Sequence, residues 1–355
     1  MNGRELFYYP AYCLLAGLLL VRLSIVMSRR FGLVDQPGER KVHTRPMPRA
    51  GGVGIFLAFH SAMLFFMISR PEHLDQVLPL FLGGLIVFSV GLMDDIYSLG
   101  PGIKLAAEFA AVLFLLYHDV RISFFIGSYF LTCLITAFWI VGITNAFNLL
   151  DNMDGLSGGT GCLAAYFFFC VFLSQGDFHL ALLAFSLSMA ILGFLRWNFS
   201  PARTFMGDCG SLYIGFNIAA LSVMGSYVFN SKLNHLPVIT PLVILSIPLY
   251  DTISVIIIRL VNGKPVFQGD QNHFSHRLVR LGFNKRLAVL LILFLSAQID
   301  LSTLLLSSLN REQAVVLLLQ MVITFFVITL IMFVSRRRIV REEQNGDQVN
   351  RHQET

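Results

Sequence analysis

Residues 145–159 read NAFNLLDNMDGLSGG, a polar and glycine-rich stretch between the apolar runs at 123–144 and 158–174. Each run approaches the ~20 residues that a helix needs to cross the hydrocarbon core of a bilayer. Polar side chains beside such a run are costly to remove from water unless they bind something. The stretch therefore predicts two membrane-spanning helices joined by a loop with a binding function.

The composition of the whole chain is that of a membrane protein. Of its 355 residues, 55% are hydrophobic and only 13% are charged, whereas an average soluble domain has about 25% charged residues. The five cysteines show no CxxC or other metal-binding spacing. The sequence therefore indicates neither a disulfide framework nor a zinc site.

A scan for apolar runs predicts eleven membrane-spanning helices. The runs cover residues 8–27, 51–69, 77–93, 105–117, 123–144, 158–174, 179–195, 210–229, 237–258, 286–307 and 313–335. The first run contains Arg22 and lacks a small-residue cleavage site, so we interpret it as a retained helix rather than a signal peptide. The predicted fold is all-α, a polytopic helical bundle without a separate soluble domain.

The distribution of Lys and Arg predicts the orientation, because cytoplasmic loops carry an excess of these residues. Most of them lie in the tail from residue 336 and in the loops 28–50, 94–104, 145–157, 196–209 and 259–285. The other side holds only Arg4, Arg70, Arg121, Lys232 and Arg311. We expect an outside N-terminus, a cytoplasmic C-terminus, one integral membrane domain over 1–335 and a basic, polar cytoplasmic tail over 336–355.

The chemically unusual residues fall on these predicted cytoplasmic loops. They are Lys41 and Arg49, then Asp94 and Asp95, then Asn145, Asn148, Asp151 and Asp154, then Asp208, and finally His273, His276 and Arg277. Adjacent carboxylates such as the aspartate pair repel each other, and a divalent cation or a basic neighbour relieves the repulsion. The four residues of the third loop recur every third position, so a helical turn would place them on one broad face.

Two histidines without a third ligand at zinc spacing fit phosphate contact better than metal binding. Carboxylates suited to a hard cation such as Mg²⁺, together with cationic side chains suited to phosphate, indicate phosphoryl transfer. Because the site lies at a membrane surface, one substrate is expected to be a lipid. A transporter is the alternative from another class. Transporters, however, place polar residues near the bilayer midplane, whereas the predicted spans here are nearly free of charge.

Five motifs, in this order, carry a family resemblance: RPMPRAGG, GLMDD, NAFNLLDNMDGL, FMGDCGS and HFSHR. Over about residues 30–285 the chain resembles the polyprenyl-phosphate N-acetylhexosamine-1-phosphate transferases, the WecA/TagO-like branch of glycosyltransferase family 4, with MraY more distant. The resemblance implies transfer of N-acetylhexosamine 1-phosphate, first of all GlcNAc 1-phosphate, from a UDP-sugar to undecaprenyl phosphate, with release of UMP. That reaction initiates lipid-linked cell-envelope polysaccharides such as O-antigen.

The resemblance also implies a cofactor, a location and roles for residues. It implies Mg²⁺, with Mn²⁺ as a substitute, in the inner membrane of a bacterium, with a homodimer as one arrangement and no nucleic acid partner. The implied metal ligands are Asp208, Asn148 and Asp151. The implied catalytic residues are Asp94, Asp95, Asp151, Asp208 and His276. The implied substrate-binding residues are Lys41, Arg49, Asn145, Asn148, Asp154, His273 and Arg277.

The last loop departs from the family pattern in two ways. MraY carries consecutive histidines, whereas this loop reads NHFSHRL, which counts against the alternative of a phospho-N-acetylmuramoyl-pentapeptide transferase. Many WecA-like proteins have an HxHH arrangement, but Ser275 stands before His276 here. The sequence therefore leaves open which N-acetylhexosamine is used. Direct displacement and a two-step route through an aspartyl-phosphate both fit the residue types.

Overall fold

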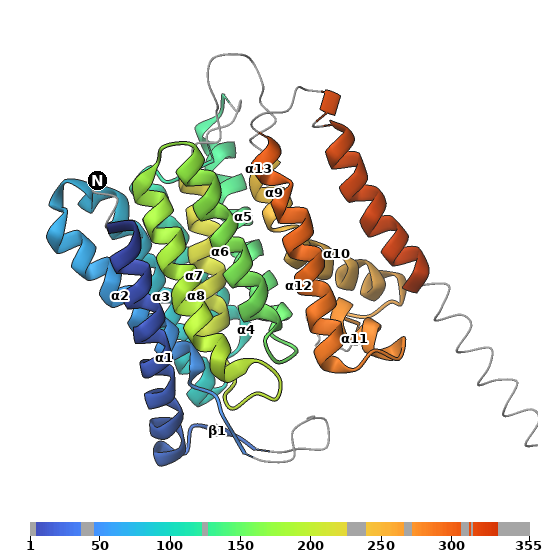
Figure 1. Cartoon of the computed structure of the whole chain (residues 1–355), viewed down its shortest axis with the longest axis horizontal. Helices are drawn as coiled ribbons and strands as arrows, with labels where there is room; N and C mark the ends of the chain where they lie inside the picture. Colours follow the sequence, from blue (N-terminus) through green and yellow to red (C-terminus); the bar gives the residue numbers. More distant parts are fainter. Residues whose placement is uncertain are drawn as a thin grey trace, which may run out of the picture.

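The structure is a computed structural model that describes residues 5–36, 46–122, 127–225, 239–265, 272–306, 312–313 and 315–332. Most of these residues lie in helices, which run side by side in a bundle (Figure 1). In chain order the elements are α1 (Glu5–Phe31), β1 (Val34–Asp35), β2 (Met47–Pro48), α2 (Gly51–Ser69), η1 (Pro71–His73), α3 (Leu74–Tyr97), α4 (Pro101–Tyr117), α5 (Tyr129–Leu150), α6 (Leu156–Ser174), α7 (Phe178–Asn198), α8 (Asp208–Met224), α9 (Thr240–Ile244), α10 (Ser246–Val261), α11 (Phe274–Arg280), α12 (Lys285–Leu301) and α13 (Thr303–Leu306). A last helix covers Val315–Met332.

Within the described ranges, eight helices are long and apolar enough to cross a membrane. They are α1, α2, α3 together with η1, α5, α6, α7, α12 together with α13, and the last helix. All eleven predicted runs overlap helices, but α4, α8 and α10 are shorter than the usual span. The protein is therefore a membrane-embedded helical bundle, as its composition predicts.

The predicted run at 237–258 is two helices rather than one. α9 ends at Ile244, and α10 begins at Ser246. Pro248 explains the break, because a proline lacks the N–H that would bond to the carbonyl four residues earlier and its ring clashes with that carbonyl. The carbonyl concerned belongs to Ile244, the last residue of α9.

The outer surface of the bundle is apolar. Leu19, Phe138 and Phe294 are 67%, 70% and 72% exposed, whereas Phe59 and Phe216 are fully buried. A contiguous apolar exterior of this kind is typical of a surface covered by lipid. Between its first and last turns, each helix satisfies its own backbone hydrogen bonds, which is what a bilayer requires of a spanning segment.

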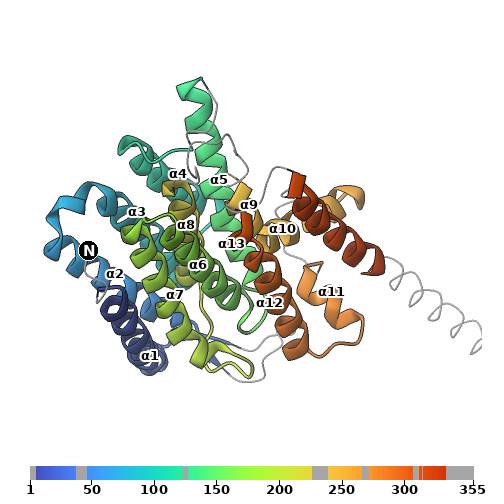
Figure 2. The same ribbon diagram turned by 45° about the horizontal axis from the view of Figure 1, so that its top comes forward.

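The short helix α8 lies at the centre of the bundle (Figure 2). It packs against α2, α3, α5 and α6, and almost all of its residues are buried. Glycines allow neighbouring helices to approach its first turn. A Cβ atom on Gly52 of α2 would lie 2.4 Å from Cα of Gly210, and one on Gly91 of α3 would lie 2.6 Å from Cα of Cys209.

Backbone hydrogen bonds join the start of α2 to the segment before α8. The N–H of Gly51 donates to the carbonyl of Phe205 at 3.0 Å, and the N–H of Gly52 donates to that of Met206 at 2.9 Å. These N–H groups belong to the first turn of α2, where no partner exists within the helix. The motifs RPMPRAGG and FMGDCGS therefore form one backbone unit beneath the site.

Candidate active site

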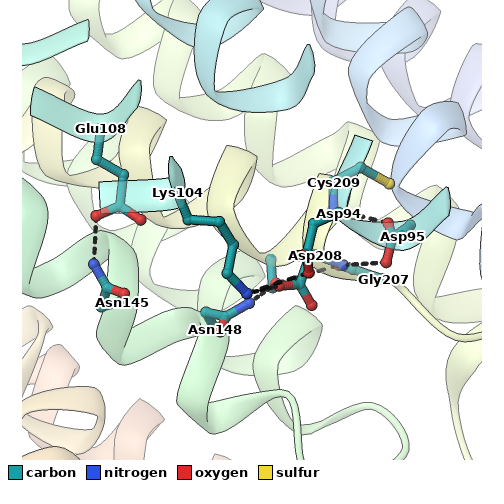
Figure 3. Close-up of polar contacts among 10 residues, drawn as sticks. Asp94, Asp95, Lys104, Glu108, Asn145, Asn148, Gly207, Asp208 and Cys209 are labelled. Carbon is teal, nitrogen blue, oxygen red and sulfur yellow. Dashed lines mark hydrogen bonds and ion pairs between the residues drawn. The ribbon is translucent and has the colours of Figure 1, made fainter. Parts of the chain in front are cut away.

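Side chains from four helices meet at one end of the bundle. α3 and α5 end there, and α4 and α8 begin there (Figure 1). Figure 3 shows Asp94, Lys104, Asn148 and Asp208, one from each of these helices, directed toward one another. The second, third and fourth predicted loops thus contribute to one polar cluster.

Lys104 bridges two of the predicted catalytic carboxylates. Its Nζ donates to Oδ2 of Asp208 at 2.8 Å and to Oδ2 of Asp94 at 3.2 Å (Figure 3). The three side chains are only 24%, 20% and 13% exposed, respectively. Two carboxylates this close repel each other unless a cation lies between them. We call the gap between Asp94 and Asp208 the cation position, which the Lys104 ammonium fills in this structure.

Asp95 is engaged with the backbone of α8. Its Oδ1 accepts the N–H of Asp208 at 2.9 Å, and its Oδ2 accepts the N–H of Cys209 at 3.0 Å. Gly207, the residue before α8, provides no side-chain cap, so Asp95 caps the helix from α3 and offsets the positive end of its dipole. These two contacts position Asp208, and the catalytic role that the resemblance implies for Asp95 stays a prediction.

Gly207 occupies a conformation that other residues rarely adopt. Its φ of 74° and ψ of 169° lie in a region that is essentially restricted to glycine. A Cβ atom would also lie 2.5 Å from the carbonyl oxygen of Arg49 and 2.5 Å from Oδ2 of Asp95. The close approach of Asp95 to the start of α8 therefore requires glycine at this position.

We expect Gly207→Ala to lower the free energy of unfolding by about 3 kcal/mol, from backbone strain and the two close contacts. The thermal midpoint of the detergent-purified protein measures the loss. Gly102→Ala is the control, because a Cβ atom there meets nothing within 4 Å. Equal midpoints for the two variants would contradict the prediction.

Asn148 and Asp151, the other predicted metal ligands, lie beside Asp208. Nδ2 of Asn148 donates at 2.9 Å to Oγ of Ser211, which lies one helical turn after Asp208 in α8. Asp151 directly follows α5. Burial, together with the nearby carboxylates of Asp208 and Asp95, raises the pKa of Asp151 to about 7. The cluster thus concentrates negative charge that a bound cation would stabilise.

The donor atoms of the cluster fit Mg²⁺ when a substrate completes its coordination. Carboxylate oxygens from Asp208 and Asp151 and an amide oxygen from Asn148 are the hard ligands that Mg²⁺ prefers. Among the described residues, no group of three or more His, Cys, Asp or Glu side chains forms a complete metal site. Mg²⁺ commonly binds one or two protein carboxylates and takes its remaining ligands from phosphates and water. These residues therefore suit a metal ion shared with a phosphorylated substrate.

One turn along α5 from Asn148, Asn145 contacts a carboxylate that the sequence analysis did not select. Its Nδ2 donates to Oε2 of Glu108 (Figure 3). Glu108 is 2% exposed, and its Oε1 has no hydrogen-bond partner among the described residues. The expectation that the spans are nearly free of charge is wrong for α4. The sequence signal that could have identified Glu108 is its place in an apolar run, one helical turn after Lys104. The predicted contact between Asn145 and a substrate stays a prediction.

The third loop does not continue as a helix. α5 ends at Leu150, so Asp151 and Asp154 lie in the following turn and not on the helical face that their spacing predicted. Gly155, with a φ of 78°, reverses the chain before α6. Oδ2 of Asp154 accepts the N–H of Ala202 at 3.1 Å. This contact ties the third loop to the fourth, and a role for Asp154 in substrate binding stays a prediction.

Of the two basic residues predicted in the first loop, the structure describes one. Arg49 forms an ion pair with Asp35, with 3.7 Å between Nη1 and Oδ1. β1 and β2 bring these two residues together by antiparallel pairing. The Arg49 side chain remains 39% exposed, and its contact with phosphate stays a prediction. Lys41 lies outside the described residues.

The last loop is anchored to α10 and to the third loop. Nδ1 of His273 lies 2.8 Å from Oδ2 of Asp251, and Oγ of Ser275 donates to Oδ1 of Asn152 at 2.6 Å. Asp251 is a second residue that the sequence analysis missed. It is the acidic residue within the apolar run at 237–258, and an ionisable group inside a predicted span is itself a signal of function.

The other two predicted residues of the last loop differ in their surroundings. Arg277 donates from Nη2 to Oγ of Ser254 at 2.6 Å and lies over the ring of Tyr250, so α10 holds it. His276 is half-buried, and burial together with the nearby His273 lowers its pKa. Within the part of the chain that the structure describes, neither Arg277 nor His276 hydrogen-bonds to the acidic cluster.

Two comparisons with known proteins agree. The model of glycosyl transferase family 4 matches residues 77–226. A Bacillus subtilis (strain 168) protein named "Probable undecaprenyl-phosphate N-acetylglucosaminyl 1-phosphate transferase" is 32% identical over 303 residues, 83% of this chain and 83% of the relative. The chain belongs to glycosyl transferase family 4.

Other relatives of this family 4 protein carry similar names. The "Decaprenyl-phosphate N-acetylglucosaminephosphotransferase" of Mycolicibacterium smegmatis is 31% identical over 299 residues, 75% of this chain and 73% of the relative. The "Undecaprenyl-phosphate alpha-N-acetylglucosaminyl 1-phosphate transferase" of Escherichia coli (strain K12) is 28% identical over 286 residues, 76% of each chain. The family match spans the acidic cluster of this family 4 protein and ends before Asp251 and the last loop.

Proposed function

We propose that this protein transfers N-acetylglucosamine 1-phosphate from UDP-N-acetylglucosamine to undecaprenyl phosphate and releases UMP. The observation that carries the proposal is the cation position between Asp94 and Asp208 at one end of an apolar bundle. A lipid phosphate reaches this end from the bilayer, and a nucleotide sugar reaches it from water. The relatives named as N-acetylglucosamine 1-phosphate transferases to undecaprenyl or decaprenyl phosphate support the choice of substrates.

The reaction exchanges one bond to phosphorus for another. An oxygen of the lipid phosphate forms a bond to the phosphorus that bears the sugar, and the bond from that phosphorus to the oxygen of UMP breaks. A phosphate monoester has its second pKa near 6, so at neutral pH the attacking group is already mainly a dianion. Asp94 orients this phosphate and accepts its residual proton. Asp95 holds the first turn of α8, and with it Asp208, in place.

Charge on the phosphates is balanced by cations at the cluster. Asp208, Asp151 and Asn148 would hold Mg²⁺, which supplies charge neutralisation on the diphosphate. Lys104, which pairs with Asp208 and Asp94 in this structure, turns its ammonium toward phosphate oxygens of the bound substrates. Arg49 and His276 add donors around the same charges.

We further infer eleven membrane-crossing segments, with the site on the cytoplasmic side of a bacterial inner membrane. The excess of Lys and Arg in the loops at this end supports the orientation. The position of the predicted second to fourth loops at one end of the bundle supports it as well. Labelling of single cysteines introduced at Asp75 and at Tyr97, the two ends of α3, in intact cells tests it: only the first is expected to react with an impermeant reagent.

The function is tested by UMP release from the detergent-purified protein. The assay contains undecaprenyl phosphate, Mg²⁺ and one UDP-sugar at a time, and parallel samples lack the lipid or contain EDTA in excess of Mg²⁺. We expect release with UDP-N-acetylglucosamine and loss of at least about 99% of it in either control, because attack requires the acceptor and the diphosphate requires charge neutralisation. A folded protein that releases no UMP from any donor would contradict the proposal and favour a transporter.

A further inference from the structure

Asp251 and His273 form a buried pair that the reaction scheme above leaves unused. Asp251, in α10, is 1% exposed and His273 is 5% exposed. Both carboxylate oxygens of Asp251 are occupied at the start of α11: Oδ2 lies 2.8 Å from Nδ1 of His273, and Oδ1 accepts the N–H of Phe274. Burial of a carboxylate is costly without such partners. The pair is therefore a fixed element of the last loop.

The geometry decides which ring nitrogen of His273 is available. A carboxylate at Nδ1 keeps a proton on that nitrogen and fixes the orientation of the ring, so Nε2 is directed away from Asp251. Among the described residues, Nε2 of His273 has no hydrogen-bond partner. Nε2 is therefore the ring atom left to contact a ligand, and histidine nitrogens are common hydrogen-bond partners of phosphate groups.

The surroundings of His273 connect it to the acidic cluster. Ser275, two residues further on, donates to Oδ1 of Asn152 at 2.6 Å. Asn152 directly follows Asp151 in the third loop, and Asp151 is close enough to Asp208 for the two carboxylates to interact. A hydrogen bond thus joins the start of α11 to the loop that carries Asp151, one of the acidic residues of the cluster.

We propose that Asp251 is a positioning residue that acts through His273, presenting Nε2 of that histidine to the diphosphate of the UDP-sugar. The proposal rests on the proposed function, since it specifies how one part of the donor is held. Asp251 itself touches no substrate. Its charge and its two hydrogen bonds determine the orientation and the proton of His273.

A double-mutant cycle on donor binding tests the proposal. The probe is UDP-N-acetylglucosamine with Mg²⁺ and without lipid acceptor, and calorimetry of the detergent-purified protein gives the dissociation constant. We expect Asp251→Asn and His273→Gln each to weaken binding about ten- to a hundredfold, as for the loss of a hydrogen bond to a charged group. The double variant should bind UDP-N-acetylglucosamine no more weakly than whichever single variant has the lower affinity. Both changes remove the same contact, that of His273 with the diphosphate.

The ¹⁵N spectrum of histidine-labelled wild-type protein gives a second readout, with His273 assigned from the spectrum of His273→Gln. We expect a proton on Nδ1. A bare Nδ1 would overturn the proposal even if Asp251→Asn failed to fold. The proposal would also be overturned if the losses of affinity in the double-mutant cycle were additive. Unchanged affinity in Asp251→Asn, together with weakened affinity in His273→Gln, would overturn it as well.

Asp300→Asn is the matched control for removing a buried carboxylate. Asp300 is fully buried near the other end of the bundle, in the last turn of α12, where it accepts from Ser296. This variant should bind UDP-N-acetylglucosamine as the wild type does. Wild-type protein that neither binds the donor nor releases UMP would contradict the proposed function, whereas active wild-type protein with an additive cycle would overturn only the role of Asp251.

Discussion

Asp208→Asn is expected to lower the rate of UMP release at least about a thousandfold while the helical bundle stays folded. The asparagine keeps the size of the side chain and an oxygen that accepts from Lys104, but it removes the negative charge. A thousandfold loss corresponds to about 4 kcal/mol, which is the order of magnitude that metal ions and preorganised charges contribute to a transition state. The measurement is UMP release at saturating UDP-N-acetylglucosamine and undecaprenyl phosphate.

Asp75→Asn is the control for the loss of one acidic side chain. Asp75 lies in the exposed first turn of α3, at the opposite end of that helix from Asp94. We expect its activity to stay within about twofold of wild type, as for surface substitutions away from a site. If folded Asp208→Asn retained more than a tenth of wild-type activity, the reacting phosphates would have to lie elsewhere.

Lys104→Met is expected to change two properties in opposite directions. Because the ammonium fills the cation position between Asp94 and Asp208, its removal leaves two unpaired carboxylates and should tighten Mn²⁺ binding about tenfold. Turnover should nevertheless fall about a hundredfold, since a cation near the phosphate oxygens is lost. Mn²⁺ titration followed by electron paramagnetic resonance measures the affinity, and UMP release measures the turnover.

The variant Lys104→Arg, which keeps the positive charge, tests whether the side chain at position 104 competes with Mn²⁺ for the cation position. It should bind Mn²⁺ within about threefold of wild type, because a positive group still faces the two carboxylates. If Lys104→Met bound Mn²⁺ more weakly than wild type, Lys104 would be supporting the metal ion and not occupying its place. Unchanged turnover in Lys104→Met would remove the lysine from the reaction.

The sequence was sufficient to predict the membrane class and the positions of the helical runs. Burial in lipid demands long apolar segments with internally satisfied backbones, and that demand is visible in composition alone. The residue types at Asp94, Asp208 and Asn148 likewise indicated a phosphate and metal chemistry. The structure brings these three side chains together from different helices, although a catalytic role for each stays a prediction.

The hydrogen-bond partners of the site residues could not be predicted from the sequence, because they depend on which helix ends meet. Asp94 and Asp95 are neighbours with the same side chain, yet one faces Lys104 and the other caps α8. The face of α3 on which each carboxylate lies decides between these roles. Asp251 was not predicted for a related reason. Its partner His273 follows twenty-two residues later, and a single acidic residue changes the hydropathy of an apolar run very little.

The joint between α2 and the segment before α8 has a consequence for the assembly of the protein during synthesis. The N–H groups of Gly51 and Gly52 find their acceptors only in Phe205 and Met206, which the ribosome adds after α2 to α7 have been made. Until then, water at the membrane surface must satisfy these amides. The N-terminal helices therefore enter the bilayer before the cluster can form, and a nascent chain that stops short of α8 carries no cation position.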